Sequence, residues 1–170
     1  MSVNQYYLET VLGRFQYLKE KAEKAINQLR NDDDLFFLLD NQSNSIAILI
    51  RHLAGNMKAR WSNPFISDGE HARNRPEEFN RIITMTKEEL MQIWDEGWQY
   101  VFNTINNLTP TDLLKDIYIR DKRYSVLEAI QWQLSHYSAH IGQILFLVKH
   151  ITGDSWQPLD NLPTWSPRND

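Results

Sequence analysis

Apolar residues recur at intervals of three and four along four long stretches of the chain, the spacing of an amphipathic helix. The first stretch covers residues 3–30, and an acidic run at residues 31–34 follows it. The second begins at Ser43 or Ser45, since either side chain could cap a helix, and it continues to Trp61. We therefore expect two long helices in the first part of the chain.

Local motifs mark the ends of the other two helices. Thr-Lys-Glu-Glu at residues 86–89 and Ser-Val-Leu-Glu at residues 125–128 are capping boxes, in which the first and fourth side chains bond each other's backbone N–H groups. Pro110 ends the third helix, and Gly153 is a suitable stop for the fourth. These motifs predict helices over residues 87–108 and from 126 to about 151.

The connections between the helices differ in character. The segment at residues 63–76 is long and polar, with proline and glycine, and loops of this length in compact domains are often functional. Residues 117–124 carry apolar residues on both sides of a polar turn and predict a small hairpin or an extended connector. The pattern predicts an all-α fold, a four-helix bundle with a long loop after the second helix and a hairpin-like connection before the fourth. We expect residues 1–170 to form a single domain, because a chain of this length buries about two thirds of its surface in one core.

Composition narrows the possible functions. The chain has no cysteine, which excludes disulfides, thiolate metal sites and a cysteine nucleophile, and makes histidine the candidate metal ligand. Its formal net charge of -4, without long runs of one sign, argues against a nucleic-acid partner. The sequence offers no basic leader before an apolar run and no apolar stretch of about 20 residues, so we expect a cytoplasmic protein without membrane association.

Two histidines lie one helical turn apart in the predicted fourth helix. His136 and His140 share a face and could reach one metal ion, and His52, in the middle of the second helix, is the candidate third ligand. The spacing alone is also compatible with histidines that form ordinary hydrogen bonds in a core or on a surface. Gln133 and Tyr137 stand where a di-iron bundle or a zinc protease of the His-Glu-x-x-His type needs glutamate, so the sequence fits neither class.

Further polar residues lie close to these histidines in the sequence. Asn56 and Gln143 are each about one turn from a histidine, where they could orient an imidazole or a bound water, or simply satisfy backbone groups. Arg73 and Arg75 belong either to a local ion-pair network that orders the loop or to the pocket, where one of them would hold an anionic group of a substrate. Gly55 costs about 1 kcal/mol relative to alanine inside a helix, unless another segment approaches closely there.

We expect the remaining histidines and aromatic residues to lie on the surface or to pack in the core or at an interface. His71, in the loop, and His150, near a helix end, are interpreted as surface residues. Tyr137 points to a different helical face from the two histidines beside it and is expected to pack in the core. The tail, with Trp156 and Trp165, is expected to pack on the bundle or on a partner subunit.

Four segments of the chain resemble the DinB/YfiT-like superfamily, particularly its branch of uncharacterised Bacillus-type proteins. They lie at residues 50–57 (IRHLAGNM), 67–70 (SDGE), 73–75 (RNR) and 136–143 (HYSAHIGQ). The resemblance extends over nearly the whole chain, and the last segment is its most specific part. It implies a four-helix bundle of the DinB type, a homodimer, and a divalent metal held by three histidines, which in this chain are His52, His136 and His140.

The resemblance also implies a class of chemistry. Three neutral histidines leave a coordination position open to water or substrate, as in catalytic sites, and they suit zinc, nickel, cobalt or iron. Relatives include enzymes that use low-molecular-weight thiols, which implies a metal-dependent thiol S-transferase that takes bacillithiol as cosubstrate and acts on small electrophiles. Two alternatives remain open: a metal-dependent hydrolase, and a noncatalytic metal-binding protein that interacts with a partner in a stress response.

Overall fold

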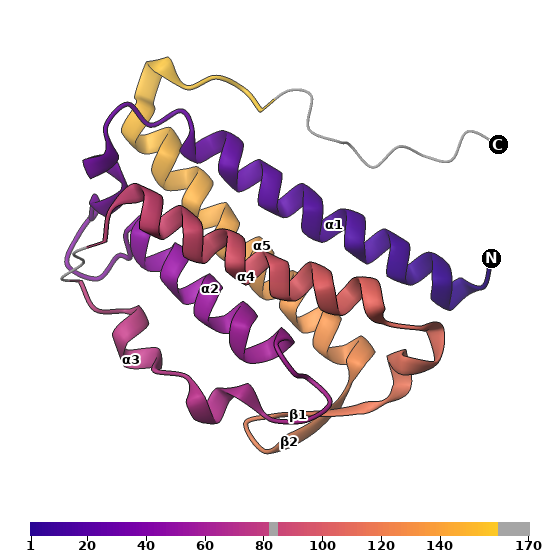
Figure 1. Ribbon diagram of the computed structural model, residues 1–170. Coiled ribbons are helices and arrows are strands. Elements are labelled where there is room, and N and C mark those ends of the chain that lie inside the picture. Colours follow the sequence, from indigo (N-terminus) through magenta and orange to yellow (C-terminus); the bar gives the residue numbers. More distant parts are fainter. Residues whose placement is uncertain (82–84, 160–170) are drawn as a thin grey trace.

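The structure is a computed structural model, and it describes residues 1–81 and 85–159. Most of these residues are helical, and four long helices lie lengthwise against one another (Figure 1). These are α1 (Val3–Ile26), α2 (Ile46–Trp61), α4 (Lys87–Asn107) and α5 (Val126–Thr152). A single turn of helix, α3 (Arg75–Glu78), lies beside α2.

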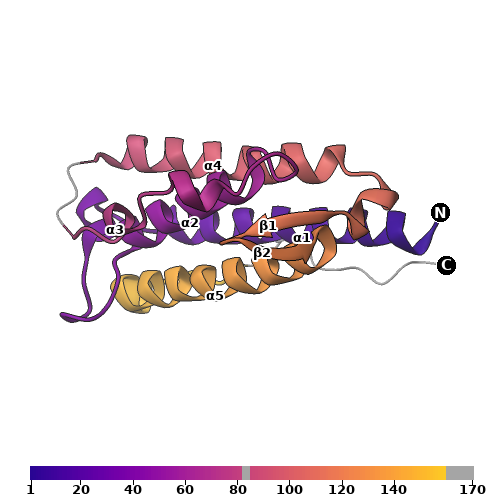
Figure 2. The same cartoon turned by 90° about the horizontal axis from the view of Figure 1, so that it is seen from below.

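Each long helix contacts two neighbours, so the four enclose one core. α2 packs against α4 and α5, and α1 packs against the same two helices (Figure 2). The core is rich in aromatic residues, including Trp98 and Tyr137, whose rings meet edge to face at 5.8 Å. Tyr137 is fully buried and its hydroxyl accepts a hydrogen bond of 3.0 Å from Nε1 of Trp61, which confirms the prediction that Tyr137 packs inside.

The predicted helix starts are confirmed. Both capping boxes form, at residues 86–89 and 125–128, and the Ser45 hydroxyl accepts from a backbone N–H in the first turn of α2. α5 ends at Gly153, which has a φ of 53°, a conformation that glycine adopts without strain. These motifs act within a single turn, which is why the sequence locates them well.

The first helix is shorter than predicted. It ends at Ile26 rather than at residue 30, because Asn27 caps it and the next residues form tight turns. Leu29 nevertheless reaches the core, so the apolar spacing continues after the helix has ended. The acidic run that follows belongs to a short 3-10 helix, Asp32–Phe36.

The long loop after α2 and the hairpin before α5 lie against each other. The segment expected to be irregular contains a 3-10 helix, Gly69–Ala72, before α3 begins. The predicted hairpin is confirmed as antiparallel strands β1 (Asp116–Ile119) and β2 (Lys122–Ser125). Asp68 Oδ2 accepts the backbone N–H of Asp121 at 3.0 Å, which holds the hairpin turn against the loop near the end of α2 (Figure 1).

Two further expectations concern the membrane and the tail. None of the helices within residues 1–81 and 85–159 combines the length and apolar character that a membrane crossing requires. Trp156 packs partly buried against the core, with Lys149 Nζ 5.6 Å from its ring centroid. Trp165 lies outside the described residues.

Candidate metal centre

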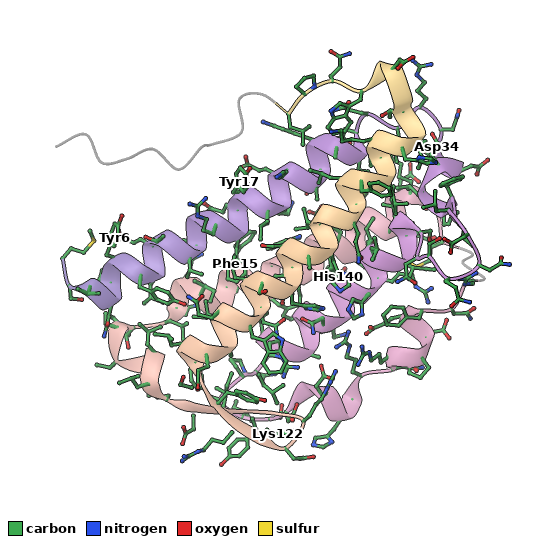
Figure 3. The ribbon with its side chains drawn as sticks, turned by 180° about the vertical axis from the view of Figure 1, so that it is seen from behind. Tyr6, Phe15, Tyr17, Asp34, Lys122 and His140 are labelled. Atoms are coloured by element: carbon green, nitrogen blue, oxygen red, sulfur yellow. The ribbon has the colours of Figure 1, made fainter. Side chains whose placement is uncertain are left out.

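The three histidines singled out in the sequence converge between α2 and α5. Nε2 of His136 lies 3.2 Å from Nε2 of His52 and 3.1 Å from Nε2 of His140. Figure 3 labels His140 on the side of α5 that faces α2. One ring nitrogen of each histidine thus points to a common position, with all three nitrogens within 4.8 Å of one another.

An oxygen atom lies beside the other nitrogen of each ring. The contacts from Nδ1 are His52 to Glu78 Oε2 at 3.1 Å, His136 to Gln133 Oε1 at 3.4 Å and His140 to Gln143 Oε1 at 3.0 Å. Since these oxygens are acceptors, they favour the tautomer with the proton on Nδ1, which leaves the Nε2 lone pair free. Nη2 of Arg73 also lies 3.2 Å from Nδ1 of His52, but it donates to Glu78 Oε2 at the shorter distance of 2.7 Å. Metal-binding histidines are oriented in the same way by outer oxygen partners.

Burial favours the neutral form of the two histidines on α5. Burial, together with the neighbouring His140 and His52, lowers the pKa of His136 to about 3, and burial lowers the pKa of His140. Imidazole lone pairs directed at one position repel one another, and a cation at that position removes the repulsion. The donor set therefore fits a divalent metal ion, which binds histidine in its neutral form.

Glu78, the partner of His52, was not predicted from the sequence. It ends α3 and lies 26 positions from His52 in the chain, so no local spacing relates the two residues. Arg73 donates to the same carboxylate, with Nε 2.6 Å from Oε1 and Nη2 2.7 Å from Oε2. Burial opposes ionisation, but the bonds from His52 and Arg73 outweigh it and lower the pKa of Glu78, which stays charged.

Gly55 was the signal in the sequence that could have pointed to Glu78. A Cβ atom at Gly55 would lie 2.2 Å from Glu78 Oε1, so an alanine cannot occupy this position unless the carboxylate shifts. Of the two cases that the sequence left open for this glycine, the structure shows the close approach of another segment. The approaching group is the carboxylate that orients His52.

The two arginines of the loop have different surroundings. The Arg73 side chain is only 4% exposed, and besides Glu78 it bonds Glu70 at 2.9 Å, so an ion-pair network of the loop forms with Arg73 and, among the described residues, without Arg75. Arg75 is exposed at the start of α3, with its guanidinium carbon 5.9 Å from the centroid of the Phe79 ring. Both arginines line the cavity described next.

A cavity of about 290 Å³ adjoins the histidines, with His52 and His136 in its wall. Asn56 also lines it; this side chain is buried, and its Oδ1 accepts no hydrogen bond from the described residues. Gln143, by contrast, lies on the exposed side of α5 and contacts His140. Of the two candidate orienting residues, Gln143 contacts an imidazole and Asn56 faces the cavity.

The other two histidines lie away from the three. His71 is exposed in the loop, with Nε2 3.1 Å from Asp121 Oδ1, and His150 is exposed near the end of α5 beside Phe37 and Phe146. Their interpretation as surface residues is confirmed.

The fold and the site together define a class: a mainly helical protein with a partly buried cluster of three histidines that could hold a metal ion between two of its helices. A family model described as "Protein of unknown function (DUF1572)" matches residues 2–163, and the chain belongs to this family. No curated protein and no solved structure matches the chain.

Proposed function

We propose that this protein is a metal-dependent enzyme of the DinB/YfiT superfamily, with His52, His136 and His140 as ligands of a divalent zinc, nickel, cobalt or iron ion. The observation that carries the proposal is the convergence of three Nε2 atoms, each on a ring whose Nδ1 faces an oxygen. Any buried neutral imidazole needs an acceptor for its one N–H; what points to a metal is that the acceptors lie at Nδ1, so that the three Nε2 lone pairs face one another without a proton between them. The same arrangement gives one metal position with three protein ligands.

A catalytic role is supported by the number of ligands and by the adjoining cavity. Structural zinc sites use four protein ligands, whereas catalytic sites use three and leave a position for water or substrate. The cavity reaches His52 and His136 and offers the free Oδ1 of Asn56 as a hydrogen-bond acceptor. A divalent metal bound there would lower the pKa of a thiol or a water molecule at the open position.

We propose a thiol S-transferase as the reaction, with bacillithiol or a similar small thiol as cosubstrate. The thiol gives up its proton to solvent, its sulfur forms a bond to an electrophilic carbon, and the leaving group departs with the bonding electrons. Glu78 and Gln143 hold the rings of His52 and His140 in place through Nδ1. The thiol must come from outside, because the chain has no cysteine.

Metal analysis of tag-free protein is the first test. We expect about one divalent ion per chain, and loss of that ion in His136→Ala while the helical circular dichroism is retained. A wild-type protein without metal, or unchanged metal content in His136→Ala, would remove the basis of the proposal.

Activity assays then separate the candidate functions. Incubation with bacillithiol and monochlorobimane should give metal-dependent conjugation. Hydrolysis of ester or amide substrates without any thiol would indicate a metal-dependent hydrolase. A protein that binds metal but is inactive with all thiols, electrophiles and hydrolase substrates would be a noncatalytic metal-binding protein.

A further inference from the structure

The cavity beside the three histidines has an unusual charge. Its described lining includes five cationic side chains and no carboxylate. The cations are Arg60, Arg73, Arg75, Arg120 and Lys122, and they come from α2, from the loop and α3, and from the hairpin. The volume, about 290 Å³, lies near the lower end of the range typical of small-molecule sites, roughly 300–1,000 Å³.

Two of the cations are already paired inside the protein. The side chains of Arg60 and Arg73 are 3% and 4% exposed, and both bond the Glu70 carboxylate, at 2.8 and 2.9 Å. Arg60 also lies 3.9 Å from Asp68, and Arg73 bonds Glu78. These two arginines therefore order the loop and hold Glu78, and their charges are largely compensated.

The other three cations lie at the rim and have little or no compensation. Arg75 and Lys122 form no ion pair with the residues that the structure describes. Arg120 is 58% exposed, and its contact is with Glu70, which two buried arginines already share. Figure 3 labels Lys122 on the hairpin, at the end of the molecule where the loop also lies.

The balance of charges around the cavity is positive. Five cations against three carboxylates leave an excess of two positive charges, in a chain whose formal net charge is -4. A concave site lined by charges of one sign attracts small ions of the opposite sign. A divalent metal on the histidines would add to this attraction.

The rest of the lining provides an apolar wall and free hydrogen-bonding groups. Trp132 is 52% exposed, which is high for a tryptophan, and its ring meets Tyr124 edge to face at 5.5 Å. The acceptor Oδ1 of Asn56 and the donor Nε of Arg60 are buried without a partner among the described residues. A ligand with an anionic group and an apolar part would match these features.

We infer that this cavity is an anion-binding subsite, and that the enzyme takes a small carboxylate- or phosphate-bearing substrate held by Arg75, Lys122 and Arg120. The apolar part of the substrate packs on Trp132. This assignment rests on the proposed function for the reaction that follows binding. The binding itself needs only the cations and the aromatic wall, so it can be measured on protein freed of metal by chelation.

The test is isothermal titration of metal-free protein with benzoate, phenyl phosphate and the neutral benzamide. We expect both anions to bind and benzamide to bind at least about tenfold more weakly, with the difference shrinking as salt is added. The tighter of the two anions identifies the group as a carboxylate or a phosphate. Arg75→Gln and Lys122→Gln should each weaken anion binding about fivefold, and more in combination.

Arg123→Gln is the matched control. Arg123 lies between Lys122 and Tyr124 on β2, so its side chain points to the other face of the ribbon, and it does not line the cavity. Like Lys122→Gln, the Arg123→Gln substitution removes one positive charge from β2, but on the face turned away from the cavity. It should leave anion binding unchanged.

Three outcomes would overturn the inference: equal binding of benzoate and benzamide, equal effects of Lys122→Gln and Arg123→Gln, or binding of anions only after metal is restored. In the last case the metal, and not the cationic rim, would hold the ligand. Failure of the proposed function is distinguishable, because a protein that binds no metal at all would still bind these anions through its cationic side chains.

Discussion

Oε2 of Glu78 lies 3.1 Å from Nδ1 of His52, and so joins the loop after α2 to the histidine cluster between α2 and α5. The carboxylate is held in turn by Arg73, which bonds Glu70 as well. The loop thus contributes to the site a carboxylate that orients His52, a candidate metal ligand. Two predictions test this relationship directly.

Replacing the carboxylate with an amide of the same shape should weaken metal binding. In Glu78→Gln the charge that fixes the Nδ1 proton of His52 is lost, and such outer partners typically contribute a factor of about 10–100 in metal affinity. Competition against a zinc chelator measures the change. Glu77→Gln is the control, because Glu77 is the preceding residue but its side chain is 59% exposed and does not contact His52. Equal affinities in the two variants would contradict this role for Glu78.

A methyl group at Gly55 should have the same effect by displacing the carboxylate. Alanine normally stabilises a helix interior by about 1 kcal/mol relative to glycine. In Gly55→Ala, however, the new Cβ would lie 2.2 Å from Glu78 Oε1, so the carboxylate must shift away from His52 or Arg73. We expect lower metal affinity, together with a free energy of unfolding that does not rise.

Gly13→Ala provides the comparison for Gly55→Ala. Gly13 is also inside a helix, α1, but nothing lies within 4 Å of a Cβ placed there. This variant should gain about 0.5–1 kcal/mol in urea unfolding and keep its metal affinity. If the two glycine variants behaved alike, the close approach of Glu78 would have no energetic consequence.

The sequence predicted those features that depend on neighbouring residues. The capping boxes at residues 86–89 and 125–128 were predicted correctly, since a cap is decided within one turn. The proximity of His136 and His140 follows from helical spacing in the same way. Their convergence with His52 depends on how α2 and α5 pack, which spacing cannot give; the sequence offered His52 only as a candidate on a second helix, and the resemblance to a known superfamily added support.

The parts that were missed depend on tertiary contacts. Glu78 lies in a four-residue helix within a polar stretch, and its role exists only because Arg73 and His52 come together around it. Periodicity does not mark such a residue. Similarly, the first helix ends at Ile26 although apolar spacing continues to Leu29, because a residue after a helix can still reach the core.

The hydroxyl of Tyr137 should matter for stability and not for metal binding. In Tyr137→Phe the buried Nε1–H of Trp61 loses its acceptor, which costs about 1–3 kcal/mol in the free energy of unfolding. Urea unfolding of the metal-free protein measures this loss, and a chelator competition should find the metal affinity unchanged. Tyr118→Phe, at a half-exposed position on β1, should change neither quantity. A loss of metal affinity in Tyr137→Phe without a loss of stability would contradict the assignment of this residue to the core.

The metal-free protein should lose stability as the pH falls below about 6.5, the ordinary pKa of histidine. Burial and the neighbouring imidazoles lower the pKa of His136 to about 3 in the folded chain, so over this range the unfolded chain takes up a proton that the folded chain does not. Stability therefore falls with decreasing pH, by up to about 1.4 kcal/mol per pH unit for each such histidine. His140, whose pKa is lowered by burial, acts in the same direction.

Urea unfolding between about pH 5 and pH 6.5 isolates the histidines, because carboxylates with lowered pKa values, such as Glu78, titrate only below about 4.5. His136→Gln should flatten the dependence of the free energy of unfolding on pH in this window, since glutamine does not titrate. His150→Gln, an exposed position on α5 away from the cluster, should leave the slope as in the wild type. If His136→Gln kept the full slope, His136 would not be held neutral in the folded protein, and its suitability as a metal ligand would lose its electrostatic basis.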